Sequence, residues 1–159
     1  KLYKKTCGEY YFLGITNKTL VKFLKETVAE ENKTFNLKYP IFKDEICELM
    51  FIRGFIDGDG SFTVTSTKDK YSFKIYCACE SFLNKFTSRC IELCNIEGYY
   101  KTDRVFELSG KHSVGNFMQK IYKYKPQISM ERKKLRAMQH LCYVFPNKVD
   151  DIVRHFNES

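Results

Sequence analysis

Asp57 and Asp59 are separated only by Gly58 at the end of an apolar run, in the stretch IRGFIDGDGSF (52–62). The spacing of the apolar residues before them predicts a helix. A carboxylate at the C-terminal end of a helix is unfavourably placed, because the helix dipole is negative there. A divalent cation would compensate, since hard cations bind carboxylate and carbonyl oxygens. Two such helices side by side would bring two carboxylate sites together, which suits two-metal hydrolysis of a phosphodiester.

The same stretch allows a simpler interpretation. DGDG (57–60) is also typical of a tight turn with solvated aspartates that leads into a hairpin. Gly54, Gly58 and Gly60 would let the helix approach a second copy closely, because no Cβ intervenes. Spacing alone leaves the metal site and the plain turn both open.

Length and charge predict one domain with a polyanionic partner. The chain has 159 residues, 43% of them hydrophobic, which is enough for a single core. Lys and Arg number 27 against 19 Asp and Glu, a net charge of +8. This surplus suits nucleic acid or, less often, an acidic membrane surface, and a merely soluble basic protein is the alternative. No apolar run approaches the roughly 18 residues that span a bilayer, so no membrane insertion is expected.

The cysteines indicate the compartment. The count of seven is odd, and the opening KLYKK does not resemble a secretory signal. Both features favour reduced thiols in an intracellular, reducing compartment, with a mitochondrion or chloroplast as an open alternative.

The elements that must position the two aspartates follow from the hydrophobic pattern. Asp44 is the predicted N-cap of the helix that runs through EICELMFIRGFI. Further helices are predicted at 18–31, 81–95, 112–123 and 131–144, with a short amphipathic helix within 148–157. A strand is predicted at 10–15 and hairpins at 61–79 and 98–110, the second turning near Thr102 and Asp103.

This order predicts an α+β fold. From residue 43 the elements run α-β-β-α-β-β-α, so helices would cover one face of an antiparallel sheet and leave the other open. The open face of the first hairpin would be polar and cationic. A curved sheet of this kind could lie in the major groove of DNA, which is wide enough for a β-ribbon.

An internal echo suggests how the chain is divided. LGITNK (13–18) and ELSGK (107–111) each precede a predicted helix, and each helix is followed by a basic stretch. We therefore expect residues 1–42 to be a partial repeat, the back half of a unit. Residues 43–145 would be a complete unit, and residues 146–159 a C-terminal tail.

The stretch IRGFIDGDGSF resembles the signature of the LAGLIDADG homing endonucleases, with Arg53 and Gly58 in the places of the motif's two alanines. KYPIFKDEICELMFIRG (38–54), SGK (109–111) and MERKK (130–134) resemble further landmarks of the family. The resemblance covers residues 10–140. It implies αββαββα units, two of which make a saddle-shaped antiparallel sheet over double-stranded DNA. The implied activity is sequence-specific cleavage of both DNA strands, in the service of intron or intein mobility.

The resemblance also implies roles for single residues. Asp59 would bind the catalytic Mg²⁺ or another divalent cation, and the Gly58 carbonyl would assist at the partner's site. Lys111, and Lys18 in the partial repeat, match a basic residue near the cleavage centre, although an ordinary phosphate contact is as good an interpretation of Lys111. The interface with a second unit would comprise Gly54, Phe55, Asp57 and Gly58.

Alternation along the strands predicts the residues that face DNA. Those of the first hairpin are Ser61, Thr63, Thr65, Thr67, Ser72, Lys74 and Tyr76. Lys101 and Arg104 would extend this surface. Arg132, Lys133 and Lys134 are expected to hold phosphates.

One departure from the family leaves several functions open. The chain has a single acidic motif, so a second LAGLIDADG unit must come from a homodimer or from a missing N-terminal domain. Besides the endonuclease, the same scaffold fits a maturase-like RNA-binding splicing cofactor and a DNA-binding protein that does not cut.

Overall fold

The computed structural model describes residues 2–4, 11–13, 16–27, 35–65, 70–124 and 130–157. For residues 2–4, 11–13, 64, 65 and 70 it describes the backbone alone. Along the described residues, the element order from residue 45 onward is helix, two strands, helix, two strands and three helices. Both the α+β class and the expected αββαββα order are confirmed.

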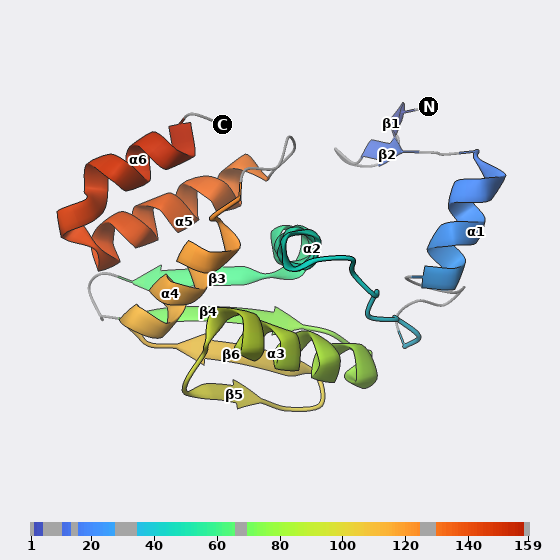
Figure 1. Cartoon of the computed structure of the whole chain (residues 1–159), viewed down its shortest axis with the longest axis horizontal. Helices are drawn as coiled ribbons and strands as arrows, with labels where there is room; N and C mark the ends of the chain where they lie inside the picture. The colour runs from blue at the N-terminus through green and yellow to red at the C-terminus, as the bar shows by residue number, and fades with distance from the viewer. Residues whose placement is uncertain are drawn as a thin grey trace.

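Helix α2 (Glu45–Asp59) carries the acidic motif and is viewed end-on near the centre of Figure 1. Asp44 is its N-cap, as predicted: a carboxylate oxygen accepts a hydrogen bond of 2.7 Å from the amide of Cys47. This bond satisfies one of the amides that a helix start leaves without a partner. The cap therefore fixes where the motif helix begins.

The strands β3 (Ser61–Thr65), β4 (Lys70–Tyr76), β5 (Tyr99–Lys101) and β6 (Val105–Ser109) form one antiparallel sheet in the order β3-β4-β6-β5. Phe62 pairs with Phe73, and Phe73 with Leu108, so these apolar side chains share one face. Helices α3 (Glu80–Cys94) and α4 (Lys111–Ile121) cover that face (Figure 1). The second hairpin turns at residues 102–104, as expected.

The core lies between this face and the helices. It is rich in phenylalanine: the ring centroids of Phe73 and Phe117 are 4.9 Å apart, and Phe86 and Phe106 are fully buried beside them. Ile52 and Ile56 bring α2 into the same core. A mostly apolar helix end is therefore held in place by burial, as the sequence pattern predicted.

Two further helices complete the main body. Helix α5 (Glu131–Val144) lies beside the β3 edge of the sheet, and α6 (Val149–Asn157) packs on α5 after a 3₁₀ turn at Pro146–Lys148 (Figure 1). A Cβ added to Gly115 of α4 would lie 2.8 Å from a methyl group of Val144, so α4 and α5 approach closely at this glycine. Among the described residues, no helix is long and apolar enough to cross a membrane.

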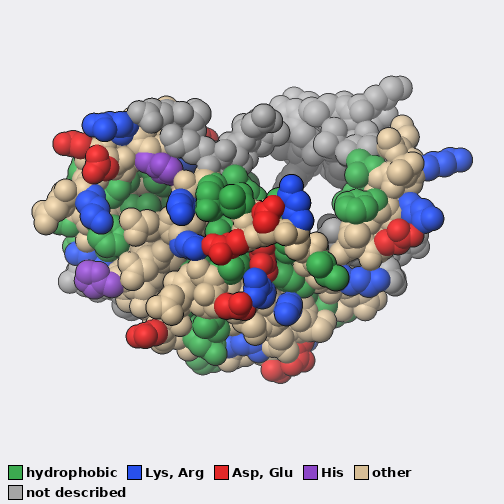
Figure 2. All heavy atoms as spheres, viewed as in Figure 1, with side chains coloured by type: hydrophobic (Ala, Val, Ile, Leu, Met, Phe, Trp, Pro, Cys, Tyr) green, Lys and Arg blue, Asp and Glu red, His purple; other side chains and the backbone are tan. Residues whose placement is uncertain are grey.

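The N-terminal segment lies on the side of α2 that is opposite α5 and α6 (Figure 1). Strand β1 (Leu2–Lys4) pairs with β2 (Tyr11–Leu13), and α1 (Lys18–Thr27) follows. The last four residues of the predicted helix 18–31 lie outside the described residues. The apolar side chains of α1 are largely exposed, and hydrophobic surface shows near it in Figure 2: Leu20, Val21, Phe23 and Leu24. The division at residue 42 stays a prediction.

Candidate active site and nucleic-acid interface

Asp59 is the last residue of α2 and its side chain is exposed. The amide of Gly60 donates a 2.8 Å hydrogen bond to the carbonyl of Ile56, which closes the last turn of the helix. A Cβ at Gly60 would lie 2.7 Å from that carbonyl and 2.9 Å from the ring of Phe73. Glycine at this position therefore lets the chain pass from α2 into β3 with Asp59 at the surface.

Asp57, in contrast, points into the protein. Its carboxylate accepts hydrogen bonds from the hydroxyl of Tyr122 (3.1 Å) and from the amide of Met130 (3.3 Å), just before α5. Burial raises the pKa of Tyr122 above its usual value, and the negative charge of Asp57 adds to the shift. Asp57 was expected at the interface with a second unit, and this is corrected: its carboxylate bonds within its own unit, near the favourable N-terminal end of α5.

Arg53 is the charged residue that stands in the place of the motif's first alanine, and its contacts within the unit stabilise it there. Its side chain is only 4% exposed. The guanidinium donates a 2.9 Å hydrogen bond to the carbonyl of Tyr124 and lies over the Tyr122 ring, 4.3 Å from its centroid. It also lies 3.8 Å from Asp57. Arg53 and Asp57 therefore share one charged cluster on the inner side of α2, beneath the end of α4.

Lys133 reaches the same helix end from α5. Its ammonium donates hydrogen bonds to the carbonyls of Ile56 (2.8 Å) and Gly58 (3.2 Å), and the residue is 7% exposed. Burial lowers the pKa of Lys133 below its usual value. The expectation that Lys133 holds a DNA phosphate is corrected, because its amino group is turned inward onto the motif helix. The cation offsets the negative end of the helix dipole beside the two aspartates.

The outer side of α2 is open. Gly54 and Gly58 are exposed, and a Cβ added at either would meet nothing within 4 Å. Phe55 packs instead against its own unit, with its ring centroid 4.9 Å from that of Phe82 and 5.2 Å from that of Phe86. The open strip that a second helix could contact is therefore formed by the glycines, and Phe55 supports it from within.

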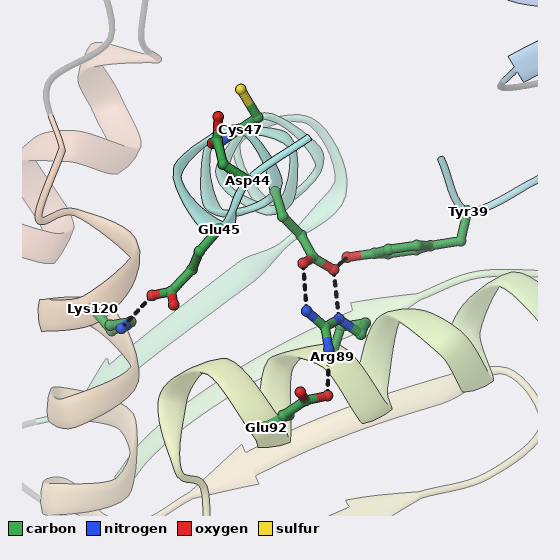
Figure 3. Close-up of polar contacts among 8 residues, drawn as sticks. Tyr39, Asp44, Glu45, Cys47, Arg89, Glu92 and Lys120 are labelled. Atoms are coloured by element: carbon green, nitrogen blue, oxygen red, sulfur yellow. Dashed lines mark hydrogen bonds and ion pairs between the residues drawn. The ribbon is translucent and has the colours of Figure 1, made fainter. Parts of the chain in front are cut away.

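The other end of α2 is anchored by ion pairs (Figure 3). Arg89 of α3 donates two hydrogen bonds to the buried carboxylate of Glu48, at 2.7 and 2.6 Å, and the hydroxyl of Tyr39 donates a third at 2.9 Å. The hydrogen bonds from Arg89 lower the pKa of Glu48. Lys120 of α4 holds Glu45 at 2.7 Å. Acidic and basic side chains also mix over this part of the surface in Figure 2. These contacts set the direction of α2 against α3 and α4.

The open face of the sheet carries two polar rows that the register defines. Ser61 pairs with Lys74, Lys74 with Glu107, and Glu107 with Tyr100. The second row is Thr63, Ser72 and Ser109. Because directly paired residues share a face, these side chains lie together on the side away from α3 and α4. Tyr76 is also exposed, at the far end of β4.

This face is less cationic than expected. Lys74 forms an ion pair of 2.8 Å with Glu107, and that hydrogen bond raises the pKa of Lys74. Lys101 is corrected too: it pairs with the buried Phe106, so it belongs to the face that the helices cover. Arg104 in the turn and Arg132 on α5 are exposed, as their expected role requires. Thr67 and the side chain of Thr65 lie outside the described residues.

The two predicted lysines occupy equivalent places in their elements. Lys111 is the first residue of α4 and Lys18 the first residue of α1. The ammonium of Lys111 lies over the ring of Tyr143, 4.5 Å from its centroid. Lys18 is exposed beside Asn17, whose side chain accepts a 3.0 Å hydrogen bond from the amide of Leu20.

The metal-binding groups are incomplete within one unit. Among the described residues, no three His, Cys, Asp or Glu side chains lie close enough to hold a cation together. Asp59 offers one exposed carboxylate, with the Gly58 carbonyl next to it. Hard oxygen ligands of this kind fit Mg²⁺, which normally takes only one or two carboxylates. The donor set therefore fits half of a site.

Sequence reasoning missed several residues of this region. Glu107 and Ser109 could have been found, because alternation with Phe106 and Leu108 places them on the open face, whereas Tyr100 joins them only through its pairing with Glu107. The contact of Arg53 and the true partner of Lys133 could not be found, since these partners lie 71 and 77 positions away along the chain.

Comparison with known proteins found one matching family and several solved structures. A family model described as a LAGLIDADG-like domain matches residues 47–121. Seven chains of solved structure match. One is the homing endonuclease I-CvuI, crystallised with the I-CreI target DNA and 2 mM Mg, in which the DNA is not cleaved. That chain is 16% identical, with a TM-score of 0.46, and the match covers 70% of this chain and 76% of the other. No curated protein matches the sequence.

The fold is an α+β domain with helices on one face of an antiparallel sheet. Its open features are the acidic end of one motif helix and the polar face of the sheet. Residues 47–121 match the LAGLIDADG-like domain, so the predicted resemblance to this family is confirmed.

Proposed function

We propose that this chain is one unit of a sequence-specific double-strand DNA endonuclease that acts with a second LAGLIDADG unit. One observation carries the proposal: Asp59 emerges, exposed, at the end of α2. The same helix leaves Gly54 and Gly58 open to a second helix. The polar face of the sheet begins two residues later, at Ser61.

Asp59 would hold Mg²⁺ or another divalent cation, and the Gly58 carbonyl would assist as an oxygen ligand at the site of the second unit. When bound, such a cation activates water and stabilises the leaving oxygen of a phosphodiester. In the proposed mechanism, Lys111 steadies developing charge near the cleavage centre, and Lys18 does so at the second site. Asp57 and Lys133 hold the helix end on which Asp59 stands, without touching DNA.

The proposed contacts to DNA lie on the open face. Ser61, Thr63 and Ser72 would read bases through hydroxyls and bridging water. Lys74 and Tyr76 continue this surface, and the remaining proposed contacts are Thr65, Thr67, Arg104 and Arg132. Glu107 limits the positive charge of this face, so base contacts rather than bulk attraction would set the specificity.

The second unit is proposed to be either another copy of this chain or a domain that precedes it. The open glycine strip of α2 supports both forms. The exposed apolar side of α1 favours the second, because this helix buries little within the described residues. A homodimer would recognise a near-palindromic site and a two-repeat protein would not.

The test is cleavage of a randomised DNA library with Mg²⁺, alongside the mass of the protein in solution by light scattering. Asp59→Asn should abolish cleavage and leave binding intact, whereas Asp103→Asn, in an exposed turn, should leave both cleavage and binding intact. Chelation of the metal should stop cleavage by the wild type. Binding of DNA without any cutting would contradict the proposal, and so would tight binding to structured RNA alone.

A further inference from the structure

A groove of about 550 Å³ lies between the edge strand β3 and helix α5. Ser61 and Thr63 form one wall, and Arg136 and Gln139 of α5 form the other. Both polar pairs are exposed. Ser61 follows Asp59 by two residues, so the groove begins next to the acidic end of the motif helix. None of the described residues that line it is acidic.

His140 is the buried polar residue of this lining. It is 1% exposed, and neither of its ring nitrogens has a hydrogen-bond partner among the described residues. Buried polar side chains rarely lack partners in native proteins, so this ring calls for a ligand. Burial lowers the pKa of His140 to about 4, with the charge of Lys111 as a second cause. The ring is therefore neutral near pH 7 and has one N–H to donate.

The positive charge around the groove indicates an anionic ligand. Arg136 offers a guanidinium at the rim, and Lys111 lies 4.5 Å from the ring centroid of Tyr143, another lining residue. Hydroxyl groups, an amide, an imidazole N–H and a guanidinium make a donor set without a carboxylate. Such a set offers no carboxylate to a hard cation and matches the oxygens of a phosphate, which guanidinium groups bind in bidentate fashion.

We propose that the groove between β3 and α5 binds a backbone phosphate of the nucleic acid, with Arg136 and the N–H of His140 donating to its oxygens. This rests on the proposed function and deepens it. It adds a phosphate contact beside the acidic helix end, at the edge of the base-facing rows, because Ser61 and Thr63 border both. It also assigns roles to Arg136 and His140, which the DNA-facing residues expected from the sequence do not include.

The test uses the whole chain, a short labelled DNA duplex of random sequence and EDTA, with affinity measured by fluorescence anisotropy over a range of salt concentrations. Arg136→Gln should weaken binding to all sequences alike and lower the slope of log K against log salt by about 1. Lys148→Gln removes the same charge from an exposed site outside the groove and should leave the slope unchanged. In the wild-type protein, the ring resonances of His140 should shift as DNA is added.

Two results would overturn the inference: equal slopes for the two variants, or His140 resonances that do not respond to bound DNA. The measurement needs no cleavage, so it separates the inference from the proposed function. If the wild type binds DNA with the expected dependence on Arg136 but never cuts, the groove stands and the endonuclease fails. The same dependence on a structured RNA and none on DNA would keep the phosphate site and overturn its assignment to DNA.

Discussion

The amino nitrogen of Lys133 lies 3.2 Å from the carbonyl oxygen of Gly58 and 2.8 Å from that of Ile56. A lysine from α5 thus caps the C-terminal end of the motif helix, where α2 has no basic residue of its own in its last turn. The helix dipole and two carboxylates concentrate negative charge there, and a buried ammonium offsets it. Helix α5 is therefore part of the support for Asp59, although it lies beyond the region that the family model matches.

Replacing Lys133 by Met should lower the free energy of unfolding by about 1–3 kcal/mol, because the Gly58 carbonyl loses its partner and the helix end its cation. Urea unfolding at neutral pH measures this. Arg132→Gln removes the same charge from the neighbouring, exposed position and should change the stability little. Equal effects of the two changes would mean that the capping contact contributes nothing.

His140 makes the stability depend on pH. Its pKa is about 4 in the folded protein and about 6.5 when the ring is solvated. Between these values the unfolded chain binds a proton that the folded chain does not, so stability falls as pH drops from about 6.5 towards 4. The loss should reach about 3 kcal/mol below pH 4, and about 2 kcal/mol of it should appear between pH 7 and pH 5. The measurement is urea unfolding at pH 7 and pH 5. His140→Phe should flatten the difference, whereas the exposed His112→Gln should retain it.

Gly54 and Gly60 should respond to alanine in opposite ways. At Gly54 the added methyl group meets open space, and alanine favours a helix over glycine by about 1 kcal/mol, so the unit should keep or gain stability. Association with a second copy should weaken, since the methyl group stands on the proposed contact strip. At Gly60 the Cβ would lie 2.7 Å from a carbonyl, and we expect a loss of about 1–3 kcal/mol.

Thermal unfolding and light scattering together test this pair. The expected pattern is a folded Gly54→Ala protein of reduced mass in solution, and a Gly60→Ala protein that unfolds at lower temperature. Unchanged association in Gly54→Ala would argue against the glycine strip as an interface. A wild-type chain that is monomeric at all concentrations would rule out the homodimer.

Removing Glu107 should strengthen binding to DNA. Its carboxylate holds Lys74 at 2.8 Å on the open face, and Glu107→Gln would leave that ammonium available to a phosphate. The slope of log K against log salt should then steepen by about 1. Anisotropy titrations over a series of salt concentrations would show it. Glu97→Gln changes the net charge equally at an exposed site off the sheet, so an identical response there would attribute the gain to net charge alone.

Much of the fold could be read from local pattern. The helix at 131–144 was predicted to the residue and the Asp44 cap was correct, because periodicity and capping are decided by neighbours in the chain. Alternation in the first hairpin correctly separated buried Phe73 from Lys74. The prediction that Lys101 faces DNA was wrong. The side of the sheet that a β5 residue faces depends on the pairing of β5 with β6, and a shift of this pairing by one residue reverses it.

The sequence by itself determined the class of the protein, the motif helix and the exposed aspartate at its end, since each depends on residues within a few positions of one another. The tertiary structure alone decided which charges are available. Lys133, Asp57 and Lys74 look like surface groups in the sequence, yet each is held by a partner from another element. Burial and ion pairing depend on contacts between distant segments, and these form only when the chain has folded.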